Sequence, residues 1–92
     1  MKNSIKVCIV GLGRAGRFHL ASIKNLDSIE LKYVVDPGLS TQDDIVQNND
    51  FILLENIEEA LADDELDAAI ISPPTQYHFE CVTRFLKAGK HV

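Results

Sequence analysis

The chain has 92 residues, of which 46% are hydrophobic and 25% are charged, and these values indicate one small globular domain. No apolar run approaches the ~18 residues of a membrane span, and the N-terminal MKNSIKV lacks the apolar region of a signal peptide. The net charge of -5 argues against a nucleic-acid-binding domain. Cys8 and Cys81 are too few for a disulfide framework and lack metal-ligand spacing, so we expect reduced core thiols in a cytoplasmic protein.

Charge is segregated along the chain. Residues 1–32 carry six Lys/Arg and two Asp/Glu, and residues 33–83 carry twelve acidic residues with no Lys or Arg. The last nine residues add Arg84, Lys87 and Lys90. Solvated helix faces are the simplest explanation for the acidic stretch. The alternative is that part of this stretch faces another portion of a larger protein.

Short apolar runs alternate with segments of helical periodicity. The expected strands cover residues 5–10, 31–36, 51–54 and 67–72, and the expected helices cover residues 14–26, 41–47, 56–63 and 76–88. In the first helix we expect Phe18, Ile23 and Leu26 to face inward. The expected N-caps are Ser40 or Thr41, Asn56 and Thr75, and the expected C-cap of the last helix is Gly89.

This alternation implies an α/β fold, a three-layer αβα Rossmann-type doubly wound parallel sheet with right-handed crossovers. Residues 90–92 resemble the first residues of a fifth strand. We therefore expect the chain to hold a little more than the first half of such a sheet, truncated near the start of that strand. The strand at 68–71 would then keep an exposed edge, from which we expect a homo-oligomer.

A glycine-rich segment follows the first strand and opens the first helix, which is the context of a dinucleotide-binding GxGxxG turn. Its first glycine permits a tight turn, its second lets the backbone approach a pyrophosphate, and its third packs helix on strand. Asp36 follows the last glycine by 20 positions and can accept hydrogen bonds from the adenosine ribose. The candidate cofactor-binding residues here are Gly11, Leu12, Gly13, Arg14, Ala15, Gly16 and Asp36. The alternatives are a turn that binds nothing and a nucleoside cofactor such as S-adenosylmethionine.

Two arginines lie in the first turn of the expected helix. Cations there oppose the helix dipole by ~0.3–1 kcal/mol, and an anionic ligand would relieve that conflict. We expect the Arg17 side chain to be solvated. For Arg14, solvent exposure and contact with the cofactor are equally compatible with the sequence. We expect His19 to be a packing or helix-surface residue.

Four segments taken together resemble one family. GLGRAGRFH at 11–19, Asp36, SPPTQYH at 72–78 and AGKHV at 88–92 are similar to the N-terminal part of the glucose–fructose oxidoreductase/inositol dehydrogenase (Gfo/Idh/MocA) family. The opening is most similar to inositol 2-dehydrogenase-like members. The resemblance implies an NAD(P)-dependent oxidoreductase that moves a hydride between the nicotinamide and a ring carbon of a sugar, cyclitol or related polyol.

The resemblance also implies that the residues after the fourth strand lie on the nicotinamide side of the cofactor: Ser72, Pro73, Pro74, Thr75 and His78. Pro74 matches the family proline that borders the nicotinamide ribose. Thr75 stands where the family often has Asn, and its hydroxyl can still form a hydrogen bond. Pro73 replaces a common Thr and removes a backbone donor. His78 matches the family histidine at the helix start, for which we expect a structural role.

In the family, Gly-Lys-His-Val leads into Glu-Lys-Pro, whose lysine positions the substrate and tunes proton transfer. Lys90 and His91 precede that position, so no catalytic residue is nominated, and we expect the chain alone to be inactive. NAD is expected over NADP because Asp36 would repel a 2′-phosphate. The rival interpretation is a non-catalytic NAD(H)-sensing module, similar in its turn to regulatory domains of potassium transport systems.

Overall fold

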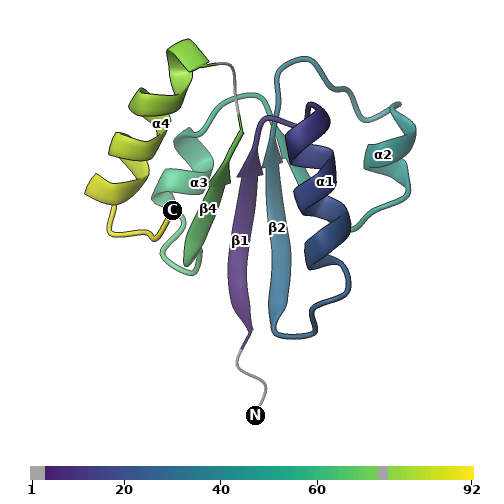
Figure 1. Ribbon diagram of the computed structural model, residues 1–92, viewed down its shortest axis with the longest axis horizontal. Coiled ribbons are helices and arrows are strands. Elements are labelled where there is room, and N and C mark those ends of the chain that lie inside the picture. The colour runs from purple at the N-terminus through teal and green to yellow at the C-terminus, as the bar shows by residue number, and fades with distance from the viewer. Residues whose placement is uncertain (1–3, 73–74) are drawn as a thin grey trace.

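The computed structural model describes residues 4–72 and 75–92, and they form one parallel sheet in the strand order β3-β2-β1-β4 (Figure 1). The strands are β1 (Ile5–Val10), β2 (Ile29–Val35), β3 (Ile52–Leu54) and β4 (Ala68–Ile71). The helices are α1 (Arg14–Ile23), α2 (Asp44–Gln47), α3 (Glu58–Ala62) and α4 (Thr75–Lys87). The predicted αβα architecture is confirmed.

Each face of the sheet has its own apolar core, because side chains alternate along each strand. The core under α1 and α2 contains Val7, Ile9, Leu12, Leu20, Ile23 and Val34. The core under α3 and α4 contains Cys8, Val10, Tyr33, Val35, Leu54, Ile57, Ala60, Leu66, Ala69 and Phe85. Ile9 and Phe85 are fully buried, and burial of such a side chain contributes about 1.5–3 kcal/mol. Both cysteines are free, and burial raises the pKa of Cys8 to about 12.

The predicted orientation of α1 is right for Ile23 and wrong for Phe18 and Leu26. The buried residues of α1 are Gly16, Leu20 and Ile23, which follow the i, i+4, i+7 spacing of one helix face. Phe18 falls outside this stripe and is 70% exposed. Leu26 is 48% exposed because the helix ends at Ile23 and Leu26 lies in the following turn.

Several element boundaries also differ from the expectations. β2 begins at Ile29, ahead of the expected Leu31. The N-cap of α2 is Asp43 in place of Ser40 or Thr41, and the Asp43 carboxylate accepts a hydrogen bond from the Ser40 backbone N–H at 2.8 Å. The N-cap of α3 is Ile57 in place of the expected Asn56, although the Asn56 Oδ1 accepts a hydrogen bond from the Glu58 N–H at 3.0 Å beside the helix start. Gly89, with φ +82°, ends α4 as predicted.

The outer edge of β4 is partly paired. His91 forms a parallel bridge with Ala68, in which the Ala69 N–H donates to the His91 carbonyl oxygen at 2.9 Å. The His91 N–H in turn donates to the Asp67 carbonyl oxygen at 3.0 Å. The predicted start of a fifth strand is thus present as one bridge, and only the first half of β4 gains an outer partner within the described residues.

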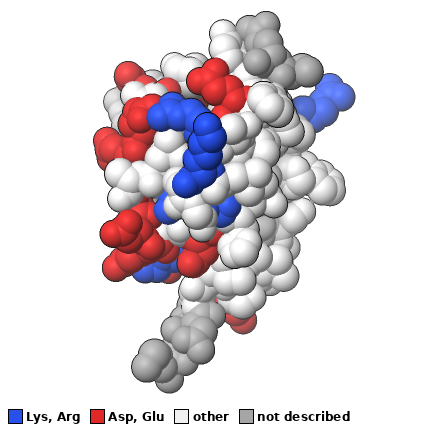
Figure 2. Space-filling model, turned by 90° about the vertical axis from the view of Figure 1, so that its left-hand side faces the viewer, with Lys and Arg blue, Asp and Glu red and all other residues white. Residues whose placement is uncertain are grey.

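The fold brings together charges that the sequence separates. Three acids of the 33–83 stretch pair with bases from outside it, in the ion pairs Glu58–Arg84, Asp63–Lys32 and Glu65–Lys6. Red and blue atoms are accordingly interspersed on the side of the molecule where α3 and α4 lie (Figure 2). The Tyr33 hydroxyl also donates to the Asp63 carboxylate at 2.7 Å. Among the described residues, no helix has the length and apolarity that crossing a bilayer requires.

Candidate functional site

A cavity of about 900 Å³ opens at the carboxyl ends of the four strands. Open α/β sheets bind ligands in this position, where the strand order reverses. The sheet order places four lining segments in a row along this edge: residues 55–56 after β3, 36–37 after β2, 11–13 after β1 and Ser72 after β4. Within the described part of the chain, five of the twelve residues nominated from the sequence line this cavity: Gly11, Leu12, Gly13, Asp36 and Ser72.

The three glycines of the turn meet different requirements. Gly11 has a φ of +87°, a conformation that side chains rarely adopt. A Cβ at Gly16 would overlap the carbonyl oxygen of Gly11, so the packing of α1 on the turn requires glycine there. Gly13 has an ordinary φ of -77°, and a Cβ added to it would meet no atom within 4 Å. Neither backbone strain nor packing requires glycine at this position, which is the N-cap of α1 and lines the cavity.

The Asp36 side chain is hydrogen-bonded to the glycine-rich turn, a role that the sequence did not predict. One carboxylate oxygen accepts from the Leu12 N–H at 2.9 Å, and the other accepts from the Gly38 N–H at 2.8 Å. Because a carboxylate oxygen has two lone pairs, each keeps capacity for a ligand hydroxyl. Asp36 lines the cavity beside the turn.

The N-terminus of α1 faces this cavity without acidic residues in its first turn. Its first backbone N–H groups have no partners within the helix, which favours an anion. The prediction of a solvated Arg17 is incomplete: the side chain is exposed, and its Nε also donates to the Leu12 carbonyl oxygen at 3.2 Å. Arg14 and Ala15 are exposed and are not among the described residues that line the cavity.

On the β4 side, Ser72 lines the cavity, and its N–H donates to the Val10 carbonyl oxygen at 2.8 Å. Pro73 and Pro74 lie outside the described residues, as does the side chain of Thr75. His78 is exposed in the first turn of α4 and is absent from the described lining of the cavity.

One face of α4 forms a cavity wall that sequence reasoning missed. The lining residues of this helix are Tyr77, Glu80, Cys81 and Arg84. Their i, i+3, i+4, i+7 spacing is the periodicity of a single helix face and was visible in the sequence. That periodicity alone does not distinguish a core face from a cavity wall.

Arg84 crosses from α4 to the first turn of α3. Its Nη1 and Nη2 donate to the two carboxylate oxygens of Glu58, at 2.7 and 3.0 Å. The hydrogen bonds from Arg84 lower the pKa of Glu58, and those to Glu58 raise the pKa of Arg84. Both side chains line the same end of the cavity.

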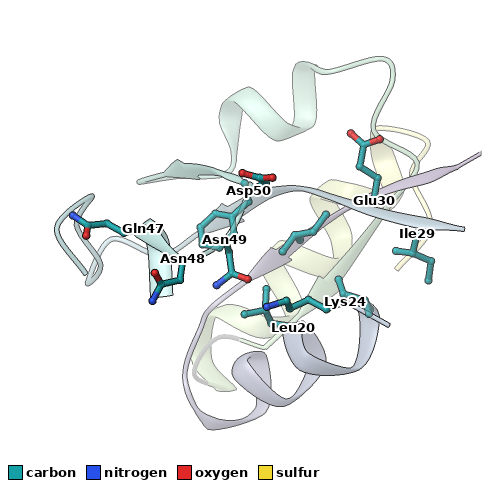
Figure 3. A pocket seen from close by; sticks show the side chains of 11 residues that line it. Leu20, Lys24, Ile29, Glu30, Gln47, Asn48, Asn49 and Asp50 are labelled. Carbon is teal, nitrogen blue, oxygen red and sulfur yellow. The ribbon is translucent and has the colours of Figure 1, made fainter. Parts of the chain in front are cut away.

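Two further features lie apart from this site. The Lys90 side chain is buried, and its Nζ donates to the carbonyl oxygens of Asp63 at 2.7 Å and Leu66 at 3.1 Å, so it anchors a loop. A second cavity, of about 420 Å³, lies between α1, the start of β2 and residues 47–51. Figure 3 shows Leu20 and Lys24 on the helix side of it. None of the nominated cofactor-binding residues lines it.

Comparison with known proteins agrees with this geometry. Residues 5–92 match the family described as an oxidoreductase family with an NAD-binding Rossmann fold. The 4-carboxy-2-hydroxymuconate-6-semialdehyde dehydrogenase of a Sphingobium species is 30% identical over 89 residues, which are 96% of this chain and 28% of that protein. The inositol 2-dehydrogenase of Corynebacterium glutamicum is 30% identical over 91 residues, which are 97% of this chain and 27% of that protein.

A solved structure is also similar, the scyllo-inositol dehydrogenase of Lactobacillus casei with bound NAD(H) and scyllo-inositol. It is 27% identical, has a TM-score of 0.83, and the match covers 97% of this chain and 27% of that one. The chain thus spans less than a third of the length of these relatives. The glycine-rich turn, its acidic partner, the sheet order and the match over residues 5–92 lead to one conclusion: the chain belongs to the Gfo/Idh/MocA oxidoreductase family, as an NAD-binding Rossmann fold.

Proposed function

We propose that residues 1–92 are the NAD-binding domain of an oxidoreductase that transfers a hydride between the cofactor and a sugar, cyclitol or related polyol. The observation that carries the proposal is Gly13, a glycine that the protein fold does not require, placed at a helix N-terminus beside Asp36. A methyl group there would occupy the space into which a pyrophosphate must fit. The inositol dehydrogenases among the similar proteins support the polyol class.

The strand order suggests how the cofactor lies along the cavity. The adenosine ribose would bind Asp36 at the end of β2, and the pyrophosphate would bind the backbone of residues 11–13 and the N-terminus of α1. The nicotinamide ribose would lie at Ser72, and the family resemblance extends this part to Pro74 and Thr75. When bound, NAD supplies the nicotinamide ring that accepts or donates the hydride.

The residues of this chain bind and orient the cofactor, and none is proposed as the catalytic acid or base. The 92-residue chain spans less than a third of the length of its relatives. We therefore assign the groups that bind the substrate and transfer the proton to other parts of the enzyme that contains this domain. We therefore expect the chain to bind NAD with a dissociation constant in the high micromolar range or weaker. We expect no dehydrogenase activity from it.

Titration calorimetry of the folded chain with NAD tests the binding, and NADH formation with inositol and common sugars tests the activity. Absence of binding at millimolar NAD would remove the cofactor assignment. Turnover above a control without protein would show that the chain carries the catalytic groups itself. In a longer protein that contains this domain, the same assay is expected to give NADH with a polyol substrate.

A further inference from the structure

Under the function proposed above, the cavity has one end to which neither phosphate nor ribose is assigned. The Asp36 N–H donates to the Leu54 carbonyl oxygen at 3.0 Å, so the end of β3 lies beside the proposed ribose position. The cavity continues there along Asn56 and Ile57. A nucleotide base extends from its ribose on the side away from the phosphates, and this end of the cavity is where the adenine would lie.

The Glu58–Arg84 pair stands at that end. Both guanidinium Nη atoms are held by one carboxylate, a two-bond arrangement that fixes the plane of the guanidinium as well as its position. The Arg84 side chain is 39% exposed, and both residues of the pair line the cavity. The bonds to Glu58 use the edge of the guanidinium and leave its flat surface available for a planar ligand group.

We propose that Arg84 recognises the adenine ring of the cofactor by stacking its guanidinium face on the base, and that Glu58 is the positioning residue. A delocalised, weakly hydrated cation stacks favourably on an aromatic ring. Beside it, the buried apolar Ile57 provides a surface suited to the base. The competing explanation is that the ion pair only braces α3 against α4.

Affinity measurements separate these explanations. Arg84→Met keeps the length of the side chain but removes the charge and the plane, and we expect affinity for adenosine diphosphate ribose to fall about 2- to 5-fold. Lys87→Met is the matched control, because it removes one charge from the same helix turn at an exposed residue outside the described cavity lining. Inorganic pyrophosphate, which has no base, is expected to bind the Arg84 and Lys87 variants equally.

A second readout uses the unmodified chain and does not depend on any variant folding. In a 15N-detected titration with adenosine diphosphate ribose, the Arg84 Nε–H resonance should shift with the ring current of the base, alongside the Gly13 amide. With inorganic pyrophosphate, Gly13 should shift and Arg84 Nε–H should not. If Gly13 responds to both ligands while Arg84 does not, and Arg84→Met binds like Lys87→Met, stacking is refuted and the pair is a brace. If neither resonance responds to millimolar ligand, the cofactor assignment fails as well.

Discussion

Replacement of Gly13 by alanine should weaken cofactor binding about tenfold or more without unfolding the protein. The residue has an extended backbone, φ -77° and ψ -154°, which alanine adopts without strain, and the new Cβ would meet no protein atom within 4 Å. Alanine is a poorer N-cap than glycine by roughly 0.5–1 kcal/mol. It also restricts the unfolded chain, which stabilises the fold by about 0.4–1 kcal/mol. The two effects nearly cancel, so the free energy of unfolding should stay within about 0.5 kcal/mol of the wild-type value.

Binding should change far more than stability. The added methyl group holds a pyrophosphate away from the backbone N–H groups, and a hydrogen bond to a charged group contributes about 1.5–3 kcal/mol. Loss of one such bond already weakens NAD binding about tenfold or more. Thermal melting and titration calorimetry on the same samples provide the two measurements.

Gly16→Ala is the contrasting variant, since its Cβ would overlap the carbonyl oxygen of Gly11 and should destabilise the fold itself. The reasoning is refuted if Gly13→Ala binds NAD like the wild type. It is equally refuted if Gly13→Ala loses as much stability as Gly16→Ala.

Three further predictions concern selectivity, pH and association. The Asp36 carboxylate and a 2′-phosphate ~4 Å apart would repel by about 4 kcal/mol at an effective dielectric of 20, so NAD should bind more tightly than NADP. Asp36→Ala should weaken NAD binding and reduce the difference in affinity between NAD and NADP. Calorimetry with both cofactors checks this, and an unchanged ratio of the two affinities would contradict it. Hydrogen bonds from Lys32 and Tyr33 hold the pKa of Asp63 well below its ordinary range, so the stability they contribute is complete above pH ~4 and is lost as the pH falls below it. In urea unfolding, Asp63→Asn should therefore cost about 1–3 kcal/mol at pH 7 and progressively less as the pH falls from about 4 towards 2, whereas a pH-independent cost would argue against the ion pair. The outer edge of β4 beyond Ala69 has no strand partner in the described residues, and an unpaired edge favours pairing with a second chain. Light scattering should therefore detect dimers or larger species, and a monomer at high protein concentration would contradict this.

Local patterns in the sequence were enough to predict the fold class and five of the residues that line the candidate site. A run of β-branched residues, a glycine-rich turn and a helix lie consecutively in the chain, and Asp36 follows at the spacing of one βαβ unit. The parallel sheet and its αβα layers then follow from the alternation of elements. The functions of Gly11 and Gly16 were also predictable, because both depend on contacts within the turn.

The tertiary structure alone decided the features that join distant parts of the chain. Phe18 is exposed because the face that α1 turns toward the sheet is fixed by Gly16, Leu20 and Ile23 together, and helical periodicity allowed more than one face. Arg84 and Glu58 are 26 positions apart on separate helices, and they meet because α3 and α4 cover the same face of the sheet. Such contacts depend on strand order and helix placement, which arise from packing of the whole chain, whereas a motif depends only on its neighbours in sequence.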